Sequence, residues 1–238
     1  MDEGNEMDFS GRNIVVTGGT GALGGAVVAA LVEAGVRCRV PYMIEAEAKN
    51  FPLRDNKRVE LVASADLADE AAVAKLYDGL PKLWASIHIA GGFAMSPVRD
   101  TGKKALMAQI DSNLVSCFLC CRAAVTAMMR AGGGRIVNIA ARPALEWRSG
   151  AGMAAYTIAK TGVAALTVAL AEEVAKDGIL VNAVAPSIMD TPANRAAMPK
   201  ADHAAWPKVE EVAASILFLA SPDNRVTRGG IVPVYGRV

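Results

Sequence analysis

The sequence of 238 residues predicts an α/β fold in which one parallel sheet is covered by helices on both faces. Three observations lead to this prediction. Short runs rich in β-branched residues alternate with alanine-rich segments of helical length along the chain. A glycine-rich turn follows the first of these runs, and further glycines separate helices from the next strand. The length suits one large domain that buries a full sheet.

Seven segments are predicted as strands because they are short, apolar and bounded by turn residues. They are residues 13–17, 37–42, 58–62, 83–90, 135–140, 179–185 and 231–234. Helices are predicted where apolar residues recur at helical spacing. These are residues 22–34, 69–79, 102–131 with a break, 154–176 and 208–220. The alternation indicates βαβ units and therefore a doubly wound sheet of about seven parallel strands.

Charge and hydropathy narrow the functional classes. The chain has 25 basic and 24 acidic residues, so no surface for nucleic acid or for an anionic membrane is indicated. No apolar run reaches the length of a membrane span, and residues 1–9 are acidic where a signal peptide is basic. We therefore expect a cytoplasmic protein with a small-molecule partner, a flexible N-terminal segment at residues 1–9 and a single domain at residues 10–238.

The cysteines offer one spacing with two interpretations. Cys117 and Cys120 form a Cys-x-x-Cys pair beside Cys121, and such pairs hold metals or exchange disulfides in some proteins. The chain has only two histidines and no second pair of this kind, and the segment has the pattern of an apolar helix. We therefore predict buried thiols and no metal site.

Residues 186–207 are the longest segment without a periodic pattern. The segment is rich in Pro, Asp and Asn, and it contains Met198 and Trp206, which could cover an apolar ring. Long loops in compact domains are usually functional or mobile. The segment is therefore predicted to be a substrate lid, with a plain surface loop as the alternative.

Two motifs point to chemistry. The turn Thr-Gly-Gly-Thr-Gly-Ala-Leu-Gly at residues 17–24 lies between the first predicted strand and the first helix, which is the setting of a phosphate-binding turn. Far downstream, Tyr156 and Lys160 are four residues apart, so a helix would present both on one face. A nearby cation lowers the pKa of a tyrosine toward the range of a general acid. Together these motifs predict a Rossmann-type dinucleotide site with a tyrosine as proton donor.

The turn and the Tyr-x-x-x-Lys motif resemble the short-chain dehydrogenase/reductase family, and the resemblance covers nearly all of residues 11–236. It implies an NAD(P)H-dependent oxidoreductase that transfers hydride between nicotinamide and a small carbonyl, quinonoid or imine-like substrate. It assigns Tyr156 as proton donor or acceptor, Lys160 as the residue that lowers the pKa of the tyrosine and binds the ribose, and Asn113 as support of a water relay. It also implies a homodimer or homotetramer. The cofactor contacts that it implies are Gly18, Thr20, Gly21, Ala22, Leu23, Gly24, Tyr42, Asp66, Leu67, Ala90, Gly91, Gly92, Tyr156, Lys160, Pro186, Met189 and Thr191.

Several positions depart from the family pattern. Ala141 stands where the family has a serine that polarises the substrate carbonyl, and Ser149 further along is the candidate substitute. The same loss occurs in dihydropteridine reductases, which residues 190–202 also resemble. His88 replaces a usual asparagine and is expected to be a hydrogen-bonded core imidazole. An enzyme is the favoured hypothesis, and a nucleotide sensor or scaffold that lost catalysis is the alternative.

The choice of cofactor stays open. Tyr42 occupies the end of the second strand, where a carboxylate would hold the ribose hydroxyls of NAD. The turn at residues 19–23 lacks an arginine that would attract the phosphate of NADP. Both NAD and NADP are therefore retained.

Overall fold

A seven-stranded parallel sheet forms the centre of the molecule in a computed structural model that describes residues 9–64 and 66–238. Its strands are β1 Asn13–Thr17, β2 Arg37–Tyr42, β3 Val59–Ala63, β4 Leu83–His88, β5 Gly134–Ile139, β6 Ile179–Pro186 and β7 Ile231–Val234. The strand order is β3-β2-β1-β4-β5-β6-β7. The predicted α/β, Rossmann-type fold is therefore confirmed, with strand ends within one or two residues of those expected.

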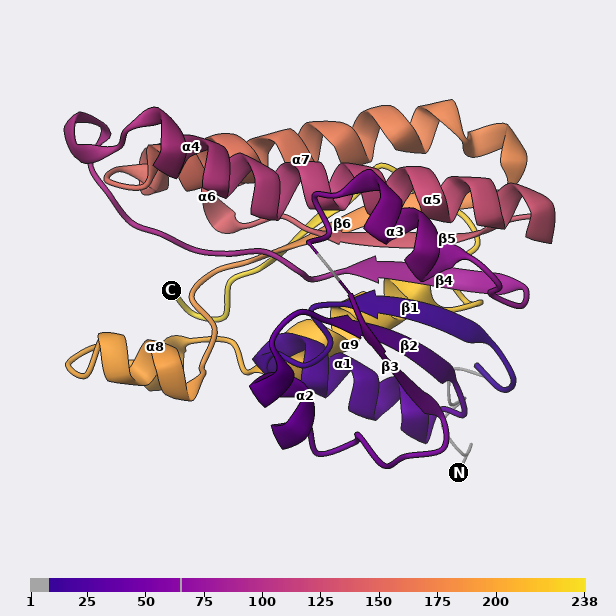
Figure 1. The fold of residues 1–238 in the computed structure, drawn as a ribbon. Coiled ribbons are helices and arrows are strands. Elements are labelled where there is room, and N and C mark those ends of the chain that lie inside the picture. Colours follow the sequence, from indigo (N-terminus) through magenta and orange to yellow (C-terminus); the bar gives the residue numbers. More distant parts are fainter. Residues whose placement is uncertain (1–8, 65) are drawn as a thin grey trace, which may run out of the picture.

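Helices cover both faces of this sheet (Figure 1). The larger ones are α1 Ala22–Glu33, α3 Glu70–Tyr77, α5 Ser116–Ala131, α7 Ala154–Glu173 and α9 Val209–Ala220. Helices α1 and α9 lie on one face, and α3, α5 and α7 lie on the other. Alternate residues of β1 point to different cores, since Ile14 and Val16 pack with α1 whereas Val15 packs with α5. Burial on both faces explains why central strands such as β1 and β6 are mostly apolar, whereas β2 and β3 at one side of the sheet carry arginine and glutamate.

The predicted break in the helix at residues 102–131 is a π-helical turn, Asp111–Val115, between α4 Lys103–Ile110 and α5. Three short helices were not predicted because four to six residues give no periodic signal. They are α2 Glu45–Asn50, α6 Arg142–Leu145 and α8 Pro192–Ala197. The 3₁₀ turns are Val98–Asp100, Trp147–Gly150, Ala175–Asp177 and His203–Ala205. Several of these elements lie in segments that connect the carboxyl ends of strands to the next large helix.

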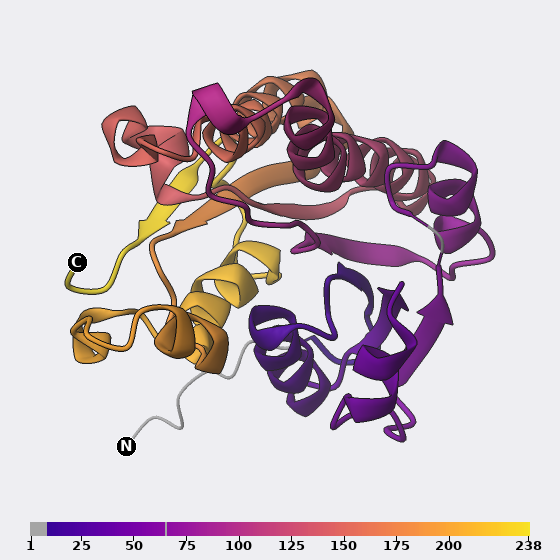
Figure 2. The same cartoon turned by 60° about the vertical axis from the view of Figure 1, so that its left-hand side comes forward.

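One sequence expectation needs correction. Residues 103–131 and 154–173 are helical, long and apolar enough to cross a membrane by length and composition, although no such run was expected. In the fold both helices lie side by side against the sheet, and core helices of soluble proteins pass the same test (Figures 1 and 2). The expected cytoplasmic location stays a prediction. The expected flexible segment at residues 1–9 stays a prediction, since residues 1–8 lie outside the described part of the chain. Phe9 is fully buried in the core.

Candidate active site

The glycine turn after β1 is shaped so that particular glycines cannot be replaced. Gly18 has a φ of +67°, and a Cβ atom there would lie 2.7 Å from the backbone nitrogen of Ala90. A Cβ atom on Gly24 would lie 2.0 Å from the carbonyl oxygen of Gly18. Helix α1 begins at Ala22, and its N-cap residue, Gly21, has no side chain that could cap the helix. The free N–H groups of its first turn therefore form an anion-binding end beside the turn.

A cavity of about 470 Å³ opens beside this turn, where the strand order passes from β1 to β4. Ligands bind at such a switch point in open α/β sheets. Twelve of the predicted cofactor residues line it: Gly18, Thr20, Gly21, Ala22, Leu23, Gly24, Tyr42, Asp66, Leu67, Ala90, Gly91 and Gly92. Eight further lining residues were not predicted, and three of them, Pro41, Met43 and Ile89, are chain neighbours of predicted ones. The other five are Ile44, Glu47, Ser64, Ser112 and Ser116.

Asn113 lies in the π-helical turn and is 1% exposed. Its Nδ2 donates hydrogen bonds to the carbonyl oxygens of Gly92 at 2.9 Å and Gln109 at 3.0 Å. Its Oδ1 is buried and accepts from no group within the described part of the chain. A Cβ atom on Gly91 would lie 2.5 Å from that oxygen and 3.6 Å from Nζ of Lys160. The glycine therefore lets the asparagine and the lysine approach the same point, and π-turns are frequent at functional sites.

Lys160 and Tyr156 share helix α7, as the spacing predicted. Nζ of Lys160 donates to the carbonyl oxygen of Ile139 at 2.8 Å and lies 5.9 Å from the centre of the Tyr156 ring. Burial lowers the pKa of Lys160 to about 8. Burial also raises the pKa of Tyr156 to about 12, so the expected lowering of the tyrosine pKa is wrong for the free protein. Desolvation of the phenolate outweighs the attraction of a cation that is itself desolvated.

Phe93 is a member of the site that sequence reasoning missed. Its ring meets that of Tyr156 edge-on, with centroids 5.1 Å apart and an interplanar angle of 85°. The Phe93 side chain is 63% exposed. Its position directly after the Gly91-Gly92 pair was the only signal in the sequence. The exposed ring forms an apolar wall beside Tyr156.

Ala141 lies just beyond the carboxyl end of β5, at the N-cap of α6, and is 5% exposed. Its methyl group therefore occupies the predicted serine position without a hydrogen-bond donor. Ser149 lies in the 3₁₀ turn Trp147–Gly150, where its hydroxyl donates to the carbonyl oxygen of Glu146 at 2.8 Å. The structure thus places Ser149 as an exposed turn residue.

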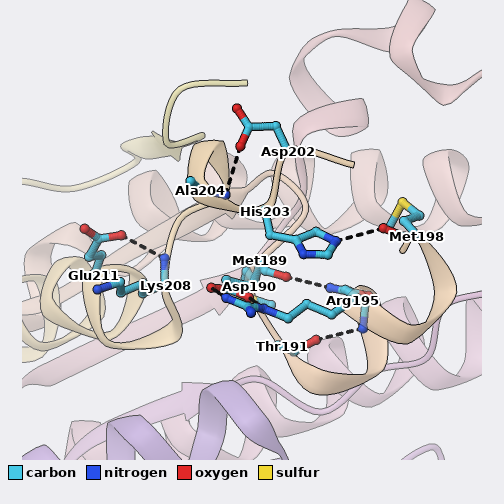
Figure 3. A network of polar contacts seen from close by, with 11 residues as sticks. Met189, Asp190, Thr191, Arg195, Met198, Asp202, His203, Ala204, Lys208 and Glu211 are labelled. Atoms are coloured by element: carbon cyan, nitrogen blue, oxygen red, sulfur yellow. Dashed lines mark hydrogen bonds and ion pairs between the residues drawn. The ribbon is translucent and has the colours of Figure 1, made fainter. Parts of the chain in front are cut away.

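The segment after β6 is folded, whereas a loop was expected (Figure 3). Thr191 caps α8, because its Oγ1 accepts from the backbone N–H of Asn194 at 3.2 Å. The carbonyl oxygen of Met189 accepts from Asn194 Nδ2 at 2.8 Å. Asp190 and Arg195 form a bidentate ion pair, in which Nε of the arginine donates to Oδ1 at 2.5 Å and Nη2 donates to Oδ2 at 2.8 Å. These contacts hold residues 189–195 as a small unit at the carboxyl edge of the sheet.

Trp206, expected to cover an apolar ring, is instead 6% exposed and packs on His203, with ring centroids 4.6 Å apart. Nε2 of His203 lies 2.8 Å from the carbonyl oxygen of Met198, within the same segment (Figure 3). The tryptophan therefore anchors the segment. The predicted contacts of Pro186, Met189 and Thr191 with a cofactor, and the lid role of residues 186–207, stay predictions.

His88 is the hydrogen-bonded core imidazole that the sequence predicted. Its Nε2 lies 2.8 Å from Oγ of Ser86, and its Nδ1 lies 2.8 Å from Oδ1 of Asn138. Cys117 donates to the same asparagine oxygen at 3.3 Å. All four cysteines are free and buried, so the prediction of buried thiols is confirmed. Ligand atoms of His88, Cys117 and Cys121 lie within 4.8 Å of one another, which shows that the helical turn, and not the Cys-x-x-Cys spacing, brings two thiols toward the histidine.

Comparison with known proteins decides the family. Residues 12–202 match the sequence profile of the family named short chain dehydrogenase. The chain belongs to the short-chain dehydrogenase/reductase family. It is therefore an NAD(P)-dependent oxidoreductase, as the turn and the Tyr-x-x-x-Lys motif predicted.

Relatives match this short-chain dehydrogenase/reductase along almost its whole length. Galactitol 2-dehydrogenase of Rhizobium johnstonii is 33% identical over 98% of this chain and 97% of its own. Cis-4-hydroxycyclohexanecarboxylate dehydrogenase of Sinomonas cyclohexanicum is 34% identical over 96% of each chain. A solved oxidoreductase of the same family from Burkholderia thailandensis superposes with a TM-score of 0.85 at 26% identity, covering 94% of this chain and 91% of its own. The closer resemblance to dihydropteridine reductases stays a prediction.

Proposed function

We propose that this enzyme transfers hydride between NAD(P)H and a small carbonyl, quinonoid or imine-like substrate, with Tyr156 as proton donor or acceptor. The observation that carries the proposal is the convergence of Lys160 and Asn113 on Gly91, next to a cavity lined by the glycine turn. Tyr156 lies on the same helix as Lys160, and Phe93 packs edge-on against its ring. A nicotinamide cofactor supplies the hydride when it is bound.

The residues present fit such a cofactor. A Cβ atom on Gly18 or Gly24 would meet backbone atoms of Ala90 or Gly18, so these glycines keep the turn tight and hold the start of α1 where a pyrophosphate can meet its free N–H groups. Ser64 contributes a buried hydroxyl oxygen that has no hydrogen-bond partner among residues 9–64 and 66–238, and it lines the same cavity. We assign the pyrophosphate to the turn and the start of α1, and a ribose to Lys160. The unpartnered oxygens of Ser64 and Asn113 are acceptors that a bound dinucleotide or water can satisfy.

The charge state of Tyr156 and Lys160 suits proton donation. At neutral pH the phenol of Tyr156 carries its proton, and because burial raises its pKa to about 12 it gives up that proton only where a cation stabilises the phenolate. The ammonium of Lys160 has three N–H groups, of which one is used on the carbonyl oxygen of Ile139. Two remain for a ribose hydroxyl and for a relay through Asn113. Below its pKa of about 8 the lysine is charged and stabilises the phenolate that proton transfer leaves behind.

The substrate class follows from Ala141 and Phe93. Loss of one electrophilic donor costs about 100- to 1000-fold in rate where the chemistry depends on it. Reduction of an electron-poor quinonoid or imine-like ring depends less on polarisation of a carbonyl oxygen than ketone reduction does. The exposed Phe93 ring beside Tyr156 offers such a ring an apolar wall. We therefore assign flat, electron-poor ring acceptors as the preferred substrates and ketones as poor ones.

The test is oxidation of NADH and of NADPH with ketones, quinones and quinonoid dihydropterin. Tyr156→Phe should lower turnover of the best acceptor about 100-fold or more, while the dissociation constant for the cofactor changes about twofold or less. Ser149→Ala is the matched control, because it also removes one hydroxyl but from an exposed turn. Unchanged turnover in Tyr156→Phe would refute the proposal. Cofactor binding without reduction of any acceptor would instead support a nucleotide-binding role without catalysis.

A further inference from the structure

We propose that Glu47 makes the adenosine end of the cofactor cavity selective for NAD over NADP. The inference rests on the proposed function, because it concerns the same cavity. Glu47 lies on α2, the short helix that follows β2, and lines the cavity. Its Oε2 accepts a hydrogen bond from Oγ1 of Thr20 at 3.0 Å. The contact ties α2 to the glycine turn and fixes a carboxylate on the wall of the cavity.

The charges on this cavity wall are acidic. Glu47 and Asp66 line it, and no lysine or arginine of residues 9–64 and 66–238 does so. The 2′-phosphate that distinguishes NADP from NAD is an anion, and proteins bind such groups with arginine or lysine. A carboxylate next to that position repels it, because like charges a few ångströms apart disfavour each other even at the surface. A 2′-hydroxyl, in contrast, donates a hydrogen bond to a carboxylate.

The basic residues near α2 are engaged elsewhere. Arg39 on β2 pairs with Glu60 at 2.9 Å, and its Nη1 donates to the carbonyl oxygens of Leu76 and Asp78, each at 3.0 Å. Lys49 on α2 lies 3.8 Å from Glu45, one helical turn back. Neither side chain lines the cavity. The cavity therefore presents no ready counter-charge to a 2′-phosphate.

The carboxylate comes from an unexpected place. Tyr42, at the end of β2, occupies the position where a carboxylate usually holds the ribose hydroxyls, and it also lines the cavity. Glu47 stands five residues further along the chain and reaches the cavity because β2 is followed at once by a helix. The buried Ser64 hydroxyl on the same wall offers a second partner for a ribose hydroxyl. The carboxylate that selects NAD therefore lies on α2 in this protein and not at the end of β2.

The experiment is direct titration of the full-length protein with NADH and with NADPH, followed by the fluorescence of the bound nicotinamide. The wild-type protein should bind NADH about tenfold or more tightly than NADPH. Glu47→Gln keeps the size of the side chain and an oxygen for Thr20 but removes the charge. It should narrow the ratio about fivefold, mainly by tightening NADPH, and the wild-type ratio should shrink in high salt. Glu33→Gln, which changes an exposed carboxylate at the far end of α1 from the cavity, is the control and should leave the ratio unchanged.

Two results would overturn the inference while leaving the proposed function intact. One is that the wild-type protein binds NADPH as tightly as NADH. The other is that Glu47→Gln binds both dinucleotides with the wild-type ratio. Failure of both dinucleotides to bind would refute the proposed function and the selectivity together. Competition by adenosine 2′,5′-bisphosphate and by 5′-AMP repeats the comparison without the nicotinamide, and the first should compete less well in the wild-type protein only.

Discussion

Lys160 is a buried cation whose cost to the fold can be measured. Only 5% of it is exposed, and burial lowers its pKa from 10.5 to about 8. The unfolded chain therefore holds the lysine proton up to a higher pH than the folded protein does. Between pH 8 and 10.5 the unfolded state binds more protons, so this group makes the free energy of unfolding rise as the pH rises. Below pH 8 the full penalty for the buried charge is present.

The magnitude follows from the difference between the two pKa values. A difference of one pKa unit corresponds to about 1.4 kcal/mol, so the buried charge costs about 3 kcal/mol at pH 7 and about 1 kcal/mol at pH 10. Lys160→Met removes this cost. It also leaves the carbonyl oxygen of Ile139 without its donor, which costs about 1 to 3 kcal/mol at either pH. Because the second cost does not depend on pH, it cancels when the two pH values are compared.

The assay is urea unfolding of the wild-type protein and of Lys160→Met without cofactor, at pH 7 and at pH 10. The stability of the variant relative to the wild type should be about 2 kcal/mol less favourable at pH 10 than at pH 7. Lys200→Met, which changes an exposed lysine, is the control and should show no such dependence. An equal difference between Lys160→Met and wild type at both pH values would show that burial does not hold the lysine pKa down.

Three further predictions concern the site and its surroundings. Gly91→Ala places a Cβ atom 2.5 Å from Oδ1 of Asn113, so it should lower the free energy of unfolding by about 1 to 3 kcal/mol and weaken cofactor binding. Gly92→Ala is the control, because its Cβ atom would lie 3.5 Å from its nearest neighbour and should change both quantities little. Unfolding and binding titrations measure both. Ala141→Ser should raise kcat/KM for ketones more than for quinonoid acceptors; equal gains would show that another donor already acts there. Exposed apolar side chains lie on both α5 (Phe118, Met129) and α7 (Ile158, Val168), and we expect the chain to self-associate through these helices. Light scattering at micromolar protein should give a dimer or tetramer, and a monomeric mass would contradict this.

The fold was largely predictable because its strands are buried on both faces. The central strands are short, mainly apolar runs, and they stand out from the longer segments in which apolar residues recur at helical spacing. The elements that were missed are short. Helix α8 begins at a proline after a threonine cap, which is a local start signal, but six residues are too few for a periodic pattern to follow it. Its stability comes from contacts such as the Asp190–Arg195 pair, which no spacing rule predicts.

The cofactor cavity was predictable where its residues belong to one continuous motif. The turn at residues 17–24 and the Ala90-Gly91-Gly92 segment both follow strands that end at the same edge of the sheet, so their proximity follows from the topology. Glu47 belongs to neither motif. It enters the cavity only because α2 folds back toward Thr20, and a glutamate in a polar stretch gives no sign of this in the sequence. Phe93 was missed for the same reason, since one exposed aromatic residue carries no period.

The pairing of Tyr156 with Lys160 shows the limit of a spacing argument. A four-residue separation correctly placed both side chains on one helix, but it could not give the sign of the shift in the tyrosine pKa. That sign depends on burial of the phenol and on whether the lysine is charged, and both are set by the strands and loops packed around α7. The carbonyl oxygen of Ile139 orients the ammonium, while burial brings the lysine pKa to about 8. The lysine can therefore stabilise a phenolate only below about that pH, which makes the tuning of the tyrosine a property of the assembled site and not of the motif.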